Sequence, residues 1–268
     1  MGMADGPGED GIDRVGDLVA RSNRIVVLTG AGISTDSGIP DFRGPQGVWT
    51  KDPKAEKMAT LQAYLGDPEV RERAWQTRLR SSTWEARPNP GHFSIVALQE
   101  RGQLHGLITQ NVDGLHQRAG VRDDLVIEVH GTMHWTRCWT CQERLPMADA
   151  LRRVAAGETD PDCLACRQSG RHGILKSDTI SFGQSLVPEV IDRAFEAART
   201  CDLLIAVGST LQVYPVAGVV PEARRAGATV VIVNAQETGM DDQAHVILRG
   251  SIGEILPRAL LSDSRPSQ

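Results

Sequence analysis

The chain has few aromatic side chains, no long apolar run and no excess of positive charge, and each shortage excludes a class of protein. Only 4% of the 268 residues are aromatic, but 40% are hydrophobic and 24% are charged, which is typical of a globular protein. No apolar stretch approaches the ~20 residues that a membrane-spanning helix needs. The formal net charge of −5 argues against broad contact with nucleic-acid phosphates. We therefore expect no membrane partner and no direct nucleic-acid binding.

The amino terminus also lacks the basic and then apolar pattern of a secretory signal, and it is too acidic for a transit peptide. We expect a cytoplasmic protein. Glycine and acidic residues dominate positions 1–11, which predicts a disordered tail there. The length allows one large domain or two small ones.

Cysteine is scarce, but its distribution is informative. Four of the five cysteines form two C-x-x-C pairs, Cys138 with Cys141 and Cys163 with Cys166. In a reducing compartment this pattern favours a metal over disulfides. Four thiolates complete a tetrahedral zinc site and leave no position open for catalysis. The sequence therefore predicts one structural zinc, and the alternative is a group of buried free cysteines.

The chain does contain a regular alternation of apolar strands and amphipathic helices. Continuous apolar runs at 24–29, 202–209 and 228–234 predict buried strands, and shorter runs at 106–110 and 125–130 predict two more. Strands that are apolar on both faces and alternate with helices imply an α/β fold with a parallel sheet covered on both sides. Between residues 131 and 172 the periodicity fades, so we interpret that segment as an insertion.

A glycine-rich connection, TGAGISTDSGIPDFRG, follows the first strand. Gly30 and Gly32 permit a tight turn and close approach to a pyrophosphate, while Ser34 and Thr35 add hydroxyl donors. Thr35 stands where a dehydrogenase fingerprint has its third glycine, and Gly38 comes three residues late. This departure counts against a dehydrogenase. Taken alone, such a turn can equally well serve packing.

Polar side chains also follow the other apolar strands, at Gln110, Asn111, Asp113, His130, Ser209 and Asn234. Gly208 directly precedes Ser209. Ligands of open α/β sheets bind at the carboxyl ends of the strands. Asn and Asp there are also common turn residues, and a lone histidine at a strand end is more often structural. His130 is nevertheless the best candidate for a general base, because histidine titrates near neutrality. The convergence of five strand ends favours a ligand site.

Together these segments resemble the sirtuin family of NAD-dependent protein-lysine deacetylases and deacylases, in its bacterial type. The matching pieces, in the family's order, are GAGISTDSGIPDFRG, TQNVDGLH, EVHG, the paired C-x-x-C knuckles, SFG at 181–183, GSTLQV and the late VN. The resemblance implies one catalytic domain over about 12–262. A Rossmann-like sheet with helices on both faces would take up about 12–44, 100–130 and 173–262. A small zinc-ribbon and helical module would take up about 45–99 and 131–172.

The resemblance also implies a role for each matching residue. NAD would be bound by Gly30, Ala31, Gly32, Ile33, Ser34, Thr35, Ile39, Asp41, Phe42, Arg43, Gln110, Asn111, Asp113, Gly208, Ser209, Asn234 and Ile252. Acylated-lysine proteins would be the partners, with the peptide held as a strand near Ile180, Phe182, Gly183 and Val213. Asn111 and His130 would be catalytic.

The implied chemistry is not hydride transfer. Nicotinamide would leave the ribose, the acyl oxygen of lysine would capture the ribosyl carbon, and His130 would act as general base on the ribose hydroxyls. The products would be free lysine and O-acyl-ADP-ribose. Two alternatives remain open, namely mono-ADP-ribosyl transfer to a protein and a catalytically weak zinc-ribbon adaptor. The intact set of Asn111, Asp113 and His130 disfavours the adaptor.

Three residues depart from the family's common pattern. Ser177 replaces a proline, Thr179 replaces a valine, and Gln184 replaces the glutamate that usually follows Phe-Gly. These departures leave the acyl preference and the catalytic strength open. Trp75 and Arg78 have the spacing of the Tyr-x-x-Arg pair of desuccinylases, but the tyrosine is missing, and a helix with a buried tryptophan is an equally good interpretation.

Overall fold

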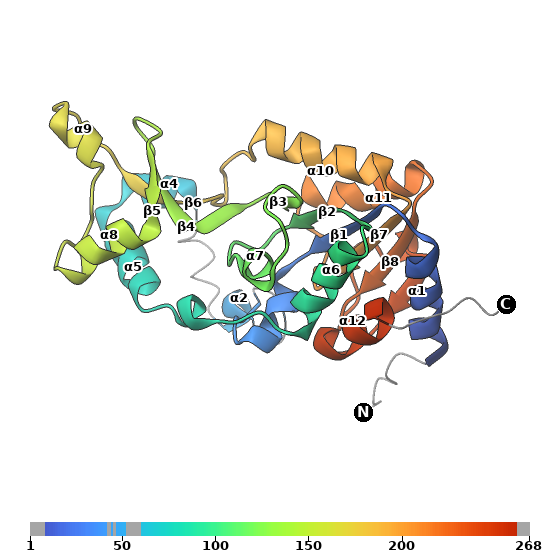
Figure 1. The fold of residues 1–268 in the computed structure, drawn as a ribbon. Helices are drawn as coiled ribbons and strands as arrows, with labels where there is room; N and C mark the ends of the chain where they lie inside the picture. Colours follow the sequence, from blue (N-terminus) through green and yellow to red (C-terminus); the bar gives the residue numbers. More distant parts are fainter. Residues whose placement is uncertain (1–8, 42–43, 45–46, 52–59, 262–268) are drawn as a thin grey trace.

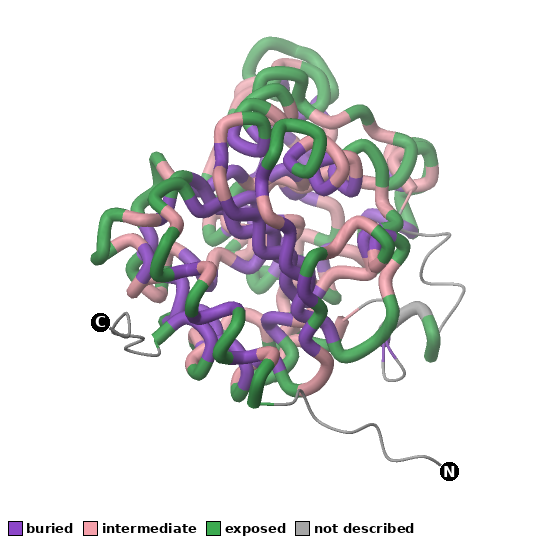
Figure 2. The backbone as a smooth tube through the Cα atoms, turned by 90° about the vertical axis from the view of Figure 1, so that its right-hand side faces the viewer, coloured by how far each residue is buried: buried purple, intermediate pink, exposed green. Residues whose placement is uncertain are grey.

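The computed structural model describes residues 9–41, 44, 47–51 and 60–261 of the chain. They form a large α/β domain at one end and a smaller module at the other (Figure 1). In Figure 2 the buried backbone runs through the centre of the large domain, and the exposed segments lie outside it. No helix within these ranges is long and apolar enough to cross a membrane.

The large domain is built on a six-stranded parallel sheet in the order β3-β2-β1-β7-β8-β9. Its strands are β1 (Ile25–Thr29), β2 (Leu104–Thr109), β3 (Val126–Glu128), β7 (Leu203–Val207), β8 (Thr229–Val233) and β9 (Val246–Leu248). From β1 the chain adds β2 and then β3 toward one edge of the sheet. It later adds β7, β8 and β9 on the other side of β1, toward the opposite edge. The switch point therefore lies between β1 and β7, where open sheets of this kind bind ligands.

Helices cover both faces of this sheet (Figure 1). The helices α1 (Glu9–Arg21), α6 (Pro90–Glu100) and α12 (Ile252–Leu261) lie on one face, and α10 (Pro188–Thr200) and α11 (Val219–Arg225) lie on the other. Side chains along a strand alternate between faces. Ile25 and Val27 accordingly join the core under α1 and α12, while Val26 and Leu28 join the core under α10 and α11.

The small module has a three-stranded antiparallel sheet in the order β5-β4-β6. Its elements are β4 (Gly131–Cys138), β5 (Arg144–Pro146), β6 (Leu175–Thr179), α4 (Leu61–Gly66), α5 (Pro68–Leu79), α8 (Met147–Ala155) and α9 (Leu164–Gln168). The remaining elements are α2 (Val48–Lys51), α7 (Leu115–Ala119), and the 3-10 helices η1 (Ala31–Ser37), η2 (Ser82–Glu85), η3 (Val216–Gly218) and η4 (Asp241–Gln243). The module's core is small and includes Trp75, Met147 and Leu175.

The predicted fold class is confirmed, but several predicted boundaries are wrong. Residues 9–11, expected in the tail, form the first turn of α1, while residues 1–8 and 262 lie outside the described part. Residues 90–99 belong to the large domain, because α6 packs its buried side chains into that core. Residues 175–179 belong to the small module, because β6 pairs with β4. The segment 131–172, which lacks apolar periodicity, contains the regular elements β4 and α8.

Candidate functional site

The glycine-rich connection after β1 packs directly against the end of β7. The amide of Gly30 donates to the carbonyl of Val207 at 2.9 Å, and the amide of Gly32 donates to the carbonyl of Gly208 at 2.9 Å. A Cβ at Gly208 would lie 2.5 Å from the amide nitrogen of Ile33, and φ there is +63°. A Cβ at Gly30 would lie 2.7 Å from the Gly208 carbonyl oxygen. These glycines therefore allow two strand ends to meet at the switch point.

A buried polar network joins this connection to the end of β2. The Asn111 side-chain amide donates to the Gly30 carbonyl at 3.1 Å and to Ser34 Oγ at 3.2 Å. Ser34 Oγ in turn donates to Asp113 Oδ2 at 2.8 Å, and Asp113 Oδ1 accepts from the amide of Leu115 at 2.9 Å. Asn111, Asp113 and Ser34 are all buried. The sequence prediction that these strand ends converge is therefore confirmed by contact.

Gln110 and His130 extend the network across the sheet edge. The Gln110 side-chain amide donates to Ser209 Oγ at 2.9 Å, which links β2 to β7. His130 Nδ1 lies 3.0 Å from the backbone carbonyl oxygen of Gln110. A carbonyl can only accept, so Nδ1 carries the proton and Nε2 keeps its lone pair in the neutral ring. Burial lowers the pKa of His130 below its ordinary value, although the hydrogen bond to Gln110 opposes this shift.

Other residues of the expected cofactor set lie at the margins of this network. Asn234 follows β8, and its side-chain amide donates to the carbonyl of Gln236 at 2.9 Å. Ile252 is buried in the core beside Ile33. Asp41 Oδ1 accepts from the amide of Gly44 at 3.0 Å.

Two more of the expected residues, Thr35 and Ile39, lie in η1 and just after it. Thr35 Oγ1 donates to the carbonyl of Gly32 at 2.9 Å, and the amide of Ile39 donates to the carbonyl of Ser34 at 3.2 Å. Phe42 and Arg43 lie outside the described residues.

The expected peptide segment leaves β6 beside His130. The amide of Ile180 donates to the His130 carbonyl at 2.8 Å, and the carbonyl of Phe182 accepts from the amide of Leu61 at 2.9 Å. Gly183 has a φ of +78°. A cleft of about 690 Å³ lies between α4 and this segment, with Phe182 and Gly183 in its lining. The segment thus connects the histidine to the small module.

The departures from the family's pattern have simple local explanations. The Gln184 side-chain oxygen accepts from the amide of Ser181 at 3.2 Å, a bond that a carboxylate could also accept. Ser177 is buried in β6, opposite Thr136 of β4. Trp75 is fully buried in the small module's core, and the Arg78 guanidinium carbon lies 5.5 Å from the centre of its ring. Trp75 is therefore a core residue.

Two histidines that the sequence analysis did not single out lie directly behind the network. His92 and His116 are buried, and their ring centroids are 4.9 Å apart. Burial lowers the pKa of His92 to about 4, while the nearby Asp113 opposes the shift. Burial, and then the neighbouring His92, lower the pKa of His116 well below its ordinary value. The only sequence signal for them was that His116 closely follows Asp113.

The four cysteines of the two knuckles come together as predicted. Their sulfur atoms all lie within 4.8 Å of one another. Cys138 Sγ is 3.7 Å from Cys166 Sγ, and Cys141 Sγ is 3.6 Å from Cys163 Sγ. Four sulfurs bound tetrahedrally at about 2.3 Å from a zinc ion would be about 3.8 Å apart. The cluster therefore fits one zinc, and its four thiols leave no open position.

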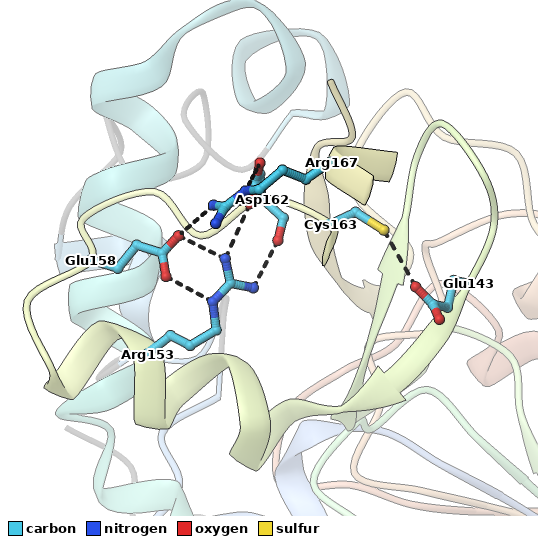
Figure 3. A network of polar contacts seen from close by, with 6 residues as sticks. All are labelled: Glu143, Arg153, Glu158, Asp162, Cys163 and Arg167. Atoms are coloured by element: carbon cyan, nitrogen blue, oxygen red, sulfur yellow. Dashed lines mark hydrogen bonds and ion pairs between the residues drawn. The ribbon is translucent and has the colours of Figure 1, made fainter. Parts of the chain in front are cut away.

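The loop that carries Cys163 is held by an ion-pair network (Figure 3). Arg153 donates to Glu158 at 2.6 Å and to the backbone carbonyl of Asp162 at 2.7 Å. Arg167 donates to the Asp162 carboxylate from the other side. A Cβ on Gly173 would lie 2.7 Å from Cys166 Sγ, so only glycine fits against the cluster. Both features set the position of the second knuckle.

Comparison with known proteins agrees with this geometry. A model described as the Sir2 family matches residues 30–215. The chain is 47% identical over 236 residues to NAD-dependent protein deacetylase 2 of Streptomyces coelicolor, covering 88% of this chain and 96% of that protein.

Solved structures show the same similarity. One, described as the structural basis for the mechanism and regulation of Sir2 enzymes, has a TM-score of 0.83 and 37% identity, covering 94% of this chain and 97% of that chain. Another, described as Sir2 with a p53 peptide and NAD+, has a TM-score of 0.79 and 32% identity, covering 91% of this chain and 95% of that chain. The family model, the Streptomyces relative and the solved structures agree. This chain belongs to the Sir2 family.

Proposed function

We propose that this protein uses NAD to remove acetyl or other acyl groups from lysine side chains of proteins, releasing nicotinamide and O-acyl-ADP-ribose. The activity named for the Streptomyces relative supports this proposal, as does the Sir2 structure with peptide and NAD+. NAD, when bound, supplies the ribosyl carbon that takes up the acyl oxygen as nicotinamide leaves. The residues at the sheet edge would bind it and direct the transfer.

The observation that carries the proposal is the state of His130. Its Nδ1 proton is committed to the carbonyl of Gln110, so its Nε2 lone pair is available to a ribose hydroxyl. Its lowered pKa keeps the ring neutral at neutral pH, as a general base requires. General bases of this kind typically accelerate a reaction by about 10²–10⁴-fold.

Asn111, Asp113 and Ser34 would act on the same ribose and on nicotinamide. The three side chains hold one another, so their orientation is set before the cofactor arrives. A leaving nicotinamide makes the ribosyl carbon electron-poor, and fixed oxygen atoms stabilise such a centre without reorganisation. Asp113 and the carbonyl of Gly30 offer oxygens of this kind.

The acylated peptide would lie between the segment 180–183 and the loop 212–215, paired with both through main-chain hydrogen bonds. The hydrogen bond between the Ile180 amide and the His130 carbonyl supports this placement, because it holds the segment that would bind the peptide beside the base. Val213 lies on the loop after β7, four residues beyond Ser209. The peptide and the cofactor would then meet at His130.

Zinc would be held by the four knuckle cysteines and would take no part in the chemistry. Its role would be to hold the module that carries β6 and the peptide segment. Because the thiols must stay reduced to bind metal, we place the protein in the cytoplasm. The net charge of −5 supports a protein substrate without direct nucleic-acid binding.

The decisive measurement is mass spectrometry of NAD turnover with acetyl-, succinyl- and long-acyl-lysine peptides. Deacylation gives O-acyl-ADP-ribose in proportion to nicotinamide and free lysine. Protein ADP-ribosylation gives a mass increase on the protein instead. An adaptor gives neither product, and that outcome would end the proposal.

The role of His130 has its own test. His130→Ala should lower deacylation at least ~10²-fold while NAD binding, measured by calorimetry, stays nearly unchanged. His105→Ala is the matched control, since His105 is exposed and, within the described part of the chain, its side chain bonds only to the Thr200 hydroxyl. Deacylation by His130→Ala at the wild-type rate would sink the mechanism.

A further inference from the structure

A chain of buried hydrogen bonds runs behind the sheet edge from α6 to Asn111. The amide of Asn89 donates to His92 Nδ1 at 3.3 Å. His116 Nε2 lies 3.0 Å from Thr29 Oγ1, and Thr29 Oγ1 donates to Thr109 Oγ1 at 2.8 Å. Thr109 Oγ1 also accepts from the backbone amide of Asn111 at 3.1 Å. The chain is broken at one place, between the two histidine rings.

Among the described residues, the atoms on either side of that break are buried and have no hydrogen-bond partner. They are His92 Nε2 and His116 Nδ1. The two ring centroids are 4.9 Å apart, with the ring planes at 53°. A buried polar atom without a hydrogen bond destabilises a folded protein, so two such atoms on neighbouring rings call for an explanation.

The fixed donors at both ends decide where the protons lie. His92 Nδ1 accepts from Asn89, so the neutral His92 ring carries its proton on Nε2. Thr29 Oγ1 donates to Thr109 Oγ1, and in that order it accepts from His116, which puts the His116 proton on Nε2. His116 Nδ1 is left as a bare acceptor. In this order the two unpartnered atoms are complementary, a donor on His92 and an acceptor on His116, on rings whose centroids are 4.9 Å apart.

We propose that His92 and His116 form one proton-ordered relay with Thr29 and Thr109, and that its purpose is to position Asn111. Every donor in the relay points the same way, from Asn89 toward Thr109. The relay fixes Thr109 Oγ1 as the acceptor of the Asn111 amide, where the chain turns out of β2. His92 and His116 are thus positioning residues, and this assignment rests on the proposed role of Asn111.

Several observations favour this role over simple packing. Thr29 and Thr109 are paired partners on β1 and β2, both buried, so their hydroxyls have few other partners in reach. A phenylalanine would fill the place of either histidine without any polar atom to satisfy. The lowered pKa of both rings, caused first by burial, is consistent with a neutral relay close to the Asp113 carboxylate.

The proton order is tested directly by ¹⁵N nuclear magnetic resonance of the histidine rings, each assigned with a single variant. We expect both rings neutral at pH 7, with the proton on Nε2 in each. In His92→Phe the His116 Nδ1 resonance should shift, because that atom loses its donor. A proton on His116 Nδ1, or no shift in His92→Phe, would overturn the relay. This measurement does not depend on catalysis.

The positioning role is tested by kinetics. Thr29→Val removes one hydroxyl of the relay at nearly constant volume, and we expect kcat to fall about 10-fold while the KM for the acyl peptide stays within about twofold. Thr136→Val is the matched control, a buried threonine of β4 whose hydroxyl donates to the carbonyl of Leu145. It should lower Tm without lowering kcat. Equal kcat in the two variants would refute the positioning role.

A rescue experiment separates hydrogen bonding from shape. His116→Gln keeps a donor that can reach Thr29 and should retain kcat within about threefold, whereas His116→Phe should lose about 10-fold. Equal losses in the two variants would contradict the relay. Asn111→Ala is measured in parallel: if it deacylates at the wild-type rate, the proposed role of Asn111 fails, whatever the ring tautomers are.

Discussion

The two parts of this molecule hold their functional side chains in different ways. The sheet edge of the large domain uses backbone carbonyls, hydroxyls, the buried carboxylate of Asp113 and two buried histidines. The small module uses four thiols within 4.8 Å of one another and a loop tied down by arginine–carboxylate pairs. One region is organised by packing, and the other is organised around a metal.

The difference follows from how much apolar surface each part buries. The large domain has two cores, one on each face of a six-stranded sheet, which hold the strand ends rigidly. The small module has a three-stranded sheet and a single small core that includes the cysteines themselves. Small cores usually need a metal or another cross-link to be stable. Packing of the fold therefore positions the side chains at the sheet edge, whereas zinc binding is needed to hold the small module in place.

The largest effect should come from breaking the metal site. Structural zinc contributes about 10–16 kcal/mol of apparent binding free energy in small zinc modules. Cys138→Ser should therefore lose zinc and unfold the small module, measured by metal analysis and by tryptophan fluorescence. Cys201→Ser is the control, because Cys201 is equally buried but belongs to the large domain. A metal-free wild-type protein as stable as the zinc form would contradict this view of the module.

The next largest effect should come from the glycine contact at the sheet edge. Gly208→Ala places a Cβ 2.5 Å from the Ile33 amide nitrogen at a φ of +63°. We expect it to lower the free energy of unfolding by about 3–5 kcal/mol through strain and overpacking. Gly170→Ala, in the small module, has a φ of +69° but nothing within 4 Å, and should cost only about 1–2 kcal/mol. Equal losses in denaturant titrations would show that the close contact is unimportant.

Acid should destabilise the large domain through its buried histidines. Burial lowers the pKa of His92 from 6.5 to about 4, and burial lowers the pKa of His116 well below its ordinary value. Between pH 6.5 and pH 4 the unfolded chain binds protons at these sites and the folded chain does not, so stability is lost as pH falls. The slope is at most about 1.4 kcal/mol per pH unit for each histidine.

Urea titrations from pH 7 to pH 4 would measure this slope. His116→Gln should make it shallower, while His105→Gln should leave it unchanged, because His105 is exposed. The same slope in wild type and His116→Gln would mean that other groups cause the acid sensitivity.

The smallest effect should come from the ion pairs of the second knuckle. Arg153→Met removes the donor that joins Glu158 to Asp162, and we expect a loss of about 1 kcal/mol and faster release of zinc to a chelator. Arg152→Met is the control, because its pair with Asp149 is exposed and should contribute almost nothing. Added salt should reduce the effect of Arg153→Met. An effect as large as that of Cys138→Ser would mean that the ion pairs, and not the metal, hold the module.

Local sequence was enough to predict most of the elements and the polar strand ends. The runs at 24–29, 202–209 and 228–234 became β1, β7 and β8, since continuous apolar residues suit strands covered on both faces. Local patterns did not predict β4 or β6. Their burial alternates irregularly, and β6 pairs with a strand about forty residues earlier in the chain.

The relay behind the sheet edge is a second example of what local patterns miss. His92 and His116 come from separate helices, and Thr29 and Thr109 come from separate strands. Nothing in the spacing of these residues brings them together. A histidine beside a polar run was the only local signal, and many surface histidines share it.

By itself, then, the sequence determined the kinds of groups available, namely a four-thiol metal site, a flexible glycine turn, and amides, a carboxylate and an imidazole at strand ends. Those follow from residue type and spacing, which are local properties. Only the tertiary structure decided which carbonyl accepts a hydrogen bond from His130, which hydroxyl is hydrogen-bonded to His116, and which glycine lies against Ile33. The physical reason is that proton positions and close contacts depend on partners from distant parts of the chain. The packing of the sheet determines which of those residues come into contact.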